Sequence, residues 1–333
     1  LLLSVLAAAA CAHAPAPAAR LPDVVWPEPP DAPRVRLAAL FPDPSAPAPA
    51  RSVFRTILDV IAGVDEADRR REAAWLARPF GIAALDGGAF AVADPDGPAV
   101  LRVPPGGAPA RVTCAGREWA APMSAAAASD GALWIADGGA GELVRIAPDG
   151  SCRAIGGGVL ERPTGLVVEA GRVLVVDPPR HQVVALALDG TVLARFGTRG
   201  DGAGQLHFPS AIARAHDGSL LVVDALNFRI ARFAPDGEWL GAFGTAGDSA
   251  GLLSRPKGIA VDGAGRIYVS DAQRDLVLVY SPAGLFEVAL ARGGEDPGQL
   301  TMPAGVAIVD RRLYVADSQN HRVQVFEILG GRP

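Results

Sequence analysis

The chain has 333 residues, a formal net charge of −5 and a pI of about 5.6. This balance argues against a nucleic-acid-binding protein, which needs a basic surface. Glycine (39 residues) and proline (29 residues) make up about a fifth of the chain, which excludes a helical bundle or a coiled coil. Half of the residues are hydrophobic, so the chain can bury a sizeable core.

The amino terminus resembles an export signal. Leu1–Ala10 is a short apolar run that ends in small residues before Cys11, as in the signal of a bacterial lipoprotein, whose cysteine is lipidated. The alternative is an ordinary secretory signal cleaved near Ala10. We therefore expect an exported protein of the cell envelope, a periplasmic or outer-membrane lipoprotein attached to the membrane through Cys11. Residues 11–33 are rich in Ala and Pro and predict an extended tether that packs no core.

Two residue types recur at intervals of 40–47 residues along the remaining chain. A proline precedes an apolar segment six times, at Pro79, Pro122, Pro163, Pro209, Pro256 and Pro303. An aspartate ends a β-rich segment six times, at Asp94, Asp137, Asp177, Asp224, Asp271 and Asp317. Each unit contains four short strands separated by Gly, Pro and Asp turns. This period predicts an all-β, six-bladed β-propeller with four-stranded blades over residues 79–329.

The sixth unit contains only three strands before the chain ends. Its outer strand must come from elsewhere, because an open edge would otherwise remain. Residues 34–41 (RVRLAALF) are the one unassigned strand-like segment. We expect this segment to close the ring as the fourth strand of blade six.

Several stretches resemble the NHL repeat. They include DSQNHRVQVF from Asp317, DALNFRI from Asp224 and FGTRGDGAGQL from Phe196. The resemblance covers about residues 79–329 and extends to bacterial six-bladed NHL lipoproteins. It implies a propeller that binds a partner, protein or RNA in most cases, whereas a minority of such propellers are lyases.

Six residues of this repeat pattern have a structural interpretation first. The aspartate can accept backbone N–H groups, the following asparagine tolerates a left-handed conformation, and the arginine can pair with the aspartate. These residues are Asp224, Asn227, Arg229, Asp317, Asn320 and Arg322.

The strand order sorts the loops between two faces of the ring. The loops that join the second strand to the third, and those that join one blade to the next, share one face, which we call face one. Residues 42–78 predict a helical insertion whose ends both belong on this face. Ser52–Ala62 has a helical apolar stripe, and Asp65–Ala77 is a second, charged candidate helix. The insertion either forms a partial lid over face one or fills the seam between blades six and one.

Arginine precedes the repeated proline in alternate blades. Arg78, Arg162 and Arg255 would surround the channel mouth, with Lys257 beside them. Such a ring could bind an anionic ligand or a carboxylate. The alternative is that these side chains pair with neighbouring acids, since 30 of the 31 basic residues are arginine.

The sequence gives no catalytic residue and no cofactor. His181 and His207 could approach each other on face one, but two histidines without a third ligand make an incomplete zinc site. Cys114 and Cys152 are placed near the end of one outer strand and the start of the next, towards opposite faces, so no disulfide is expected.

We therefore expect a non-catalytic binding or scaffold propeller that presents face one to a protein, peptide or glycan in the cell envelope, and not to nucleic acid. The alternative is a metal-dependent propeller lyase or lactonase-like enzyme that acts on the same face.

Overall fold

The structure is a computed structural model that describes residues 21–43 and 75–329. The predicted signal segment, the lipidation site Cys11 and the candidate helix Ser52–Ala62 lie outside the described residues. Most of Asp65–Ala77 also lies outside them.

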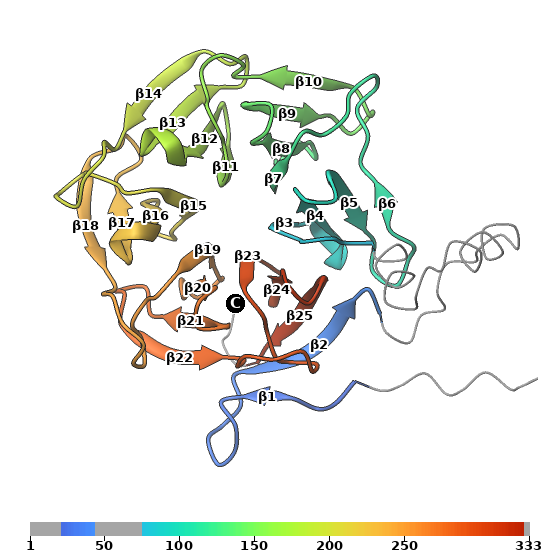
Figure 1. Cartoon of the computed structure of the whole chain (residues 1–333), viewed down its shortest axis with the longest axis vertical. Helices are drawn as coiled ribbons and strands as arrows, with labels where there is room; N and C mark the ends of the chain where they lie inside the picture. Colours follow the sequence, from blue (N-terminus) through green and yellow to red (C-terminus); the bar gives the residue numbers. More distant parts are fainter. Residues whose placement is uncertain (1–20, 44–74, 330–333) are drawn as a thin grey trace, which may run out of the picture.

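The described residues form six antiparallel sheets arranged in a ring around a central channel (Figure 1). They contain no α-helix and three short 3-10 turns, η1 (Asp86–Gly88), η2 (Pro178–Arg180) and η3 (Ala225–Asn227). The prediction of an all-β, six-bladed propeller with four-stranded blades is confirmed. In blades one to five, the first strand along the chain lies next to the channel and the fourth lies at the outer edge (Figure 1).

The first three blades share this order. Blade one contains β3 (Gly81–Ala84), β4 (Phe90–Asp94), β5 (Ala99–Val103) and β6 (Ala110–Arg111). Blade two contains β7 (Pro122–Ala127), β8 (Leu133–Asp137), β9 (Glu142–Ile146) and β10 (Cys152–Ile155). Blade three contains β11 (Leu166–Glu169), β12 (Arg172–Asp177), β13 (Gln182–Ala187) and β14 (Val192–Phe196).

The other three blades repeat it, with one addition in blade six. Blade four contains β15 (Pro209–Arg214), β16 (Leu220–Asp224), β17 (Arg229–Phe233) and β18 (Trp239–Phe243). Blade five contains β19 (Pro256–Val261), β20 (Ile267–Asp271), β21 (Leu276–Tyr280) and β22 (Phe286–Leu290). Blade six contains β23 (Pro303–Val309), β24 (Arg312–Asp317) and β25 (Arg322–Ile328), followed by β2 (Val35–Phe41) and β1 (Val25–Trp26).

Glycines near the start of the inner strands let neighbouring blades approach closely. A Cβ atom added at Gly258 would lie 2.5 Å from the carbonyl oxygen of Ala304 in the next blade. A Cβ atom at Gly81 would lie 2.5 Å from the carbonyl oxygen of Met123. Real Cβ atoms do not approach that closely, so glycine at these positions sets how tightly the inner strands pack around the channel.

The repeated aspartates join the loops of each blade. All six side chains are buried. Asp317 accepts a hydrogen bond from the backbone N–H of Thr301 at 2.7 Å, and Asp271 accepts one from Ser254 at 2.7 Å. These donors lie in the loop that enters the blade. The repeat pattern predicts donors in the turn between the second and third strands. Asp271 also accepts from that turn, at the N–H of Gln273.

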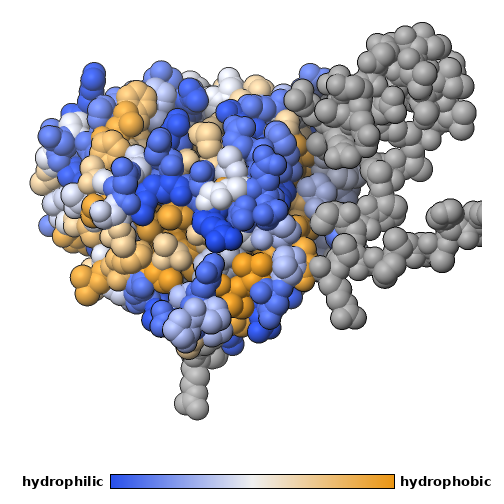
Figure 2. All heavy atoms as spheres, turned by 60° about the horizontal axis from the view of Figure 1, so that its bottom comes forward, coloured by the Kyte–Doolittle hydropathy of each residue, from blue (hydrophilic) through white to orange (hydrophobic). Residues whose placement is uncertain are grey.

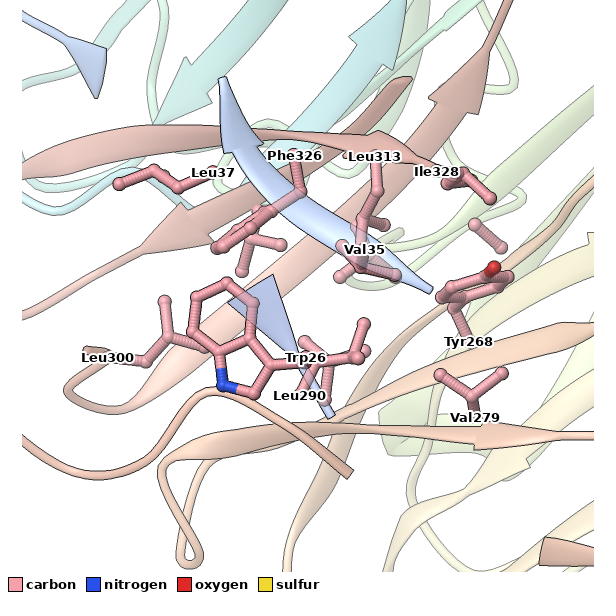
Figure 3. Packing of buried hydrophobic residues seen from close by; sticks show 14 of the residues in the cluster. Trp26, Val35, Leu37, Tyr268, Val279, Leu290, Leu300, Leu313, Phe326 and Ile328 are labelled. Carbon is pink, nitrogen blue, oxygen red and sulfur yellow. The ribbon is translucent and has the colours of Figure 1, made fainter. Parts of the chain in front are cut away.

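The amino-terminal segment closes the ring, as predicted. Strand β2 pairs antiparallel with β25, with Val35 opposite Ile328 and Leu37 opposite Phe326. Figure 3 shows these side chains packing together between blades five and six. Blade six therefore receives its fourth strand from the other end of the chain.

The prediction that residues 11–33 pack no core is wrong for its last part. Val25–Trp26 forms β1, a fifth strand that pairs with β2. The Trp26 side chain is 7% exposed and packs edge-on against Phe326, with ring centroids 5.5 Å apart (Figure 3). One aromatic residue thus gives a Pro-rich stretch enough apolar surface to bind the sheet edge.

The prediction that Cys114 and Cys152 do not form a disulfide is also wrong. The two cysteines are bonded, with Cα atoms 5.8 Å apart. The sequence pattern places Cys114 near the end of the outer strand of blade one, but β6 ends at Arg111. Cys114 already belongs to a bend closed by a bridge to Arg117. The chain therefore leaves the sheet early and reaches the first residue of β10.

Exposed apolar side chains occur on the outer strands of the described ring. Leu240 in β18 is 53% exposed, and Leu285, just before β22, is 70% exposed. Figure 2 shows that hydrophobic areas alternate with hydrophilic ones on the side of the ring that lies at the bottom of Figure 1.

Candidate functional site

A cavity of about 430 Å³ occupies the face-one end of the channel. It is lined by the loops that enter the blades and by the loops between second and third strands, so the two loop sets that the sequence assigned to face one meet here. The residue that follows each repeated proline lines this cavity, and we call these six residues the floor ring: Phe80, Met123, Thr164, Ser210, Lys257 and Ala304.

The rim of the cavity combines cations with apolar side chains. Arg78, Arg162 and Arg255 line it, and together with Lys257 they bring all four predicted ligand-binding residues to one cavity. Phe208 and Met302 occupy the equivalent positions in blades four and six, and both line it as well.

One of these cations forms a salt bridge. The Arg78 guanidinium binds the Asp96 carboxylate through two nitrogens, each 2.9 Å from an oxygen. Within residues 21–43 and 75–329, the structure gives no ion pair to Arg162, Arg255 or Lys257. The rim therefore carries positive charge that the described part of the chain does not balance.

These surroundings lower the pKa of the Lys257 amine. Burial lowers the pKa of Lys257, and the nearby charges of Arg255, Arg78 and Arg162 lower it further. Each of these causes disfavours the protonated ammonium. An anion in the cavity would reverse the electrostatic part of this effect.

The repeat residues form loop contacts within blades four and six. Arg229 binds Asp224 at 2.8 Å and donates to the carbonyl oxygen of Asp201 at 2.7 Å. Asn227 donates to Asp224 at 2.8 Å. These bonds tie the turn after β16 to the loop that enters the blade.

The same arrangement recurs in blade six. Arg322 binds Asp317 at 2.7 Å and donates to the carbonyl oxygen of Glu295 at 2.8 Å. Asn320 donates to Asp317 at 2.9 Å. Since these polar groups are already satisfied by one another, they hold loops rather than a ligand.

His181 and His207 lie side by side, with ring centroids 5.5 Å apart. Nδ1 of His181 accepts the backbone N–H of Phe208 at 3.1 Å. Burial lowers the pKa of His181, and His207 and Arg199 lower it further. The His181 ring also packs edge-on against the Phe208 ring at 4.6 Å. His181 therefore helps to position Phe208 at the rim of the cavity. Within the described chain, no third candidate metal ligand lies close to the two histidines.

The channel below the floor ring is lined by the inner strands. This second cavity has about 330 Å³ and is bordered mainly by Gly, Ala, Val and Ile residues. Arg214 is the charged residue in its lining, and this arginine pairs with Glu169. Over the ranges that the structure covers, no three His, Cys, Asp or Glu side chains lie close enough to hold a metal ion.

Apart from Lys257, the members of the floor ring were not predicted from the sequence. The signal was present, because every member directly follows a repeated proline. Aligning the six units at that position would have shown Lys257 as the one charged residue among five uncharged ones.

Comparisons with known proteins agree with the propeller fold. The family model of the NHL repeat matches residues 300–326, which span most of blade six. No curated protein sequence matches the chain. Among the described residues, no helix is both long and apolar enough to pass through a bilayer.

Solved structures with the same fold have different functions. A virginiamycin B lyase from Staphylococcus aureus is 15% identical with a TM-score of 0.57, over 76% of this chain and 96% of that chain. A gluconolactonase from Xanthomonas campestris is 18% identical with a TM-score of 0.60, over 76% and 86% of the two chains. A chain of the nidogen–laminin complex is 18% identical with a TM-score of 0.56, over 72% and 86%.

At these identities the likeness shows the fold alone, and the fold is shared by enzymes and by a protein of a binding complex. Together with the blade count and the repeat match, these findings show that the chain is a six-bladed β-propeller carrying an NHL repeat at residues 300–326.

Proposed function

We propose that this protein is a non-catalytic binding propeller of the cell envelope, which takes an acidic segment of a protein or peptide partner at the face-one cavity. The supporting observation is the group of Arg162, Arg255 and Lys257, which line one cavity and form no ion pair with the described residues. Like charges held close together repel one another, and an incoming carboxylate removes that repulsion.

The apolar rim favours a peptide over a glycan. Phe208, Leu226 and Met302 line the cavity and are 42%, 48% and 36% exposed. Exposed aromatic and methionine side chains next to arginine are typical of protein–protein contact surfaces. A neutral glycan offers hydroxyl groups, which match this combination of charge and apolar surface less well.

The proposed location follows from residues 1–11. Their apolar run and Cys11 resemble a lipoprotein export signal, so we place the protein in the periplasm or on the outer membrane with a lipid anchor. The metal-dependent lyase or lactonase alternative rests on the fold, and no cluster of metal ligands among the described residues supports it.

The test is crosslinking in the native envelope with charge-reversed variants. Arg162→Glu/Arg255→Glu/Lys257→Glu should lose the crosslinked partner. The matched control reverses three cations at the outer edge, Arg36→Glu/Arg153→Glu/Arg292→Glu, and should keep it. Equal capture of the partner by both variants would contradict the proposal. Crosslinking that is abolished by prior glycosidase treatment, and not by added acidic peptides, would also contradict it.

A further inference from the structure

The face-one cavity holds the only lysine of the chain. Lys257 lies in the floor ring, whose other five members are uncharged. Its position in β19 is fixed by the neighbouring inner strand, because the Ser210 hydroxyl donates to the Lys257 carbonyl oxygen at 2.8 Å. Lys257 thus lies at the start of an inner strand, where the register between β19 and β20 shifts.

Neither of the two hydroxyls on the floor acts as a partner for the amine. Ser210 donates to the Lys257 backbone, and Thr164 donates to the carbonyl oxygen of Ser210 at 2.9 Å. In the part of the chain that the structure describes, no carboxylate forms an ion pair with Lys257. A lysine without a counter-ion, on a floor whose other members are uncharged and next to three guanidinium groups, has an unusual setting for a structural cation.

This setting is the one in which an amine becomes nucleophilic. Burial and neighbouring cations both favour the neutral amine, whose lone pair can attack a carbonyl carbon. Both causes lower the pKa of Lys257: burial is the largest cause, and the charges of Arg255, Arg78 and Arg162 follow. The cavity of about 430 Å³ leaves room for a small organic molecule above the amine.

We propose that Lys257 captures carbonyl compounds that carry a carboxylate, such as 2-oxo acids and aldehydic acids, as a reversible imine at the floor of the face-one cavity. Arg162 and Arg255 hold the carboxylate, since guanidinium groups bind carboxylates through paired hydrogen bonds. This inference goes beyond the proposed function, because it needs the cavity and Lys257 but no macromolecular partner.

The chemical step balances without an oxidant or a reductant. The lone pair of the amine nitrogen forms a bond to the carbonyl carbon, and the electrons of the C=O π bond move to oxygen. The resulting carbinolamine loses its oxygen as water together with the two protons of the original amine. The water leaves through the open face of the cavity, and addition of water reverses the capture.

The experiment uses glyoxylate as the probe and cyanoborohydride to reduce the imine to a stable secondary amine. Because the chain has one lysine, peptide mass mapping separates Lys257 from the amino terminus without ambiguity. The matched control is Lys257→Arg/Arg292→Lys, which moves the lysine to an outer position whose side chain is 72% exposed. Because a lowered pKa increases the fraction of neutral amine at pH 7, we expect Lys257 to be labelled faster than the control lysine.

Acetaldehyde, which lacks a carboxylate, isolates the role of the arginines. The ratio of the glyoxylate rate to the acetaldehyde rate should fall in Arg162→Gln/Arg255→Gln, since that ratio cancels any change in the basicity of the amine. Labelling of Lys257 no faster than labelling of the exposed control lysine would overturn the proposal, and so would an unchanged ratio. Either result leaves the crosslinking test of partner binding intact, and a urea midpoint equal to that of the wild type confirms that each variant is folded.

Discussion

Trp26 provides the sharpest test of how the amino-terminal segment holds the ring. Its side chain is 7% exposed and packs edge-on against Phe326 at 5.5 Å. The indole also packs against the loop that joins blade five to blade six, where a Cβ atom added at Gly298 would lie 3.0 Å from the ring. We therefore predict that Trp26→Ala destabilises the closure of the propeller.

The magnitude follows from the burial. Replacing a buried tryptophan with alanine costs about 3–5 kcal/mol in transfer and cavity terms. The edge-on contact with Phe326 accounts for about 0.5–1.5 kcal/mol of this. Strand β1 has two residues at the edge of the sheet, so part of the cost can be avoided by local detachment. We expect a loss of about 3 kcal/mol in the free energy of unfolding.

The assay is urea unfolding followed by far-ultraviolet circular dichroism. Leu285→Ala is the control, since this side chain is 70% exposed and should change stability by about 0.5 kcal/mol or less. Trypsin should also cleave after Arg34 and Arg36 faster in Trp26→Ala than in the control. A Trp26→Ala midpoint as close to the wild type as that of Leu285→Ala, with unchanged cleavage, would show that Trp26 does not stabilise the closure.

Three further outcomes are expected. Cys114 and Cys152 are 38 residues apart, so reduction of their bond should lower the free energy of unfolding by about 4 kcal/mol through loop entropy. The urea midpoint of Cys114→Ser/Cys152→Ser should then not change when reductant is added. Gly258→Ala should destabilise by about 1–3 kcal/mol through overpacking, whereas Gly263→Ala, with nothing within 4 Å of the added Cβ, should leave the urea midpoint unchanged. Burial lowers the pKa of His181 in the folded state. The contribution of neutral His181 to the free energy of unfolding is therefore retained above the unfolded pKa of about 6.5 and is lost as the pH falls below that value. His181→Gln should flatten that acid slope in urea midpoints measured between pH 8 and pH 5, and an unflattened slope would contradict the assigned cause.

Most of the fold was predictable because it depends on local patterns that repeat. Strand and turn chemistry recurs six times, so an error in one unit is corrected by the others. Each repeated aspartate, from Asp94 to Asp317, ends the second strand of its repeat unit, as the repeat pattern predicts. The closing strand followed by elimination, since one strand-like segment remained for one open edge.

The mistakes concern features that repeat nowhere else in the chain. Trp26 lies in a Pro-rich stretch whose composition indicates a tether. Its packing partners, the edge of β2, the Phe326 ring and the loop at Gly298, come together only in the folded ring. The position of Cys114 depended on where β6 ends, and this blade departs from the pattern of the others.

The candidate site also has one feature that the sequence predicts and another that depends on the tertiary structure. The sequence alone determined that arginine precedes the repeated proline in alternate blades, since spacing along the chain becomes angle around the ring. It could not determine which cations find a counter-charge. The tertiary structure decided that Arg78 pairs with Asp96 while Arg162, Arg255 and Lys257 face a shared cavity. The physical reason is that closing the ring brings together side chains from separate blades, and their neighbours there are set by loop packing and not by local sequence.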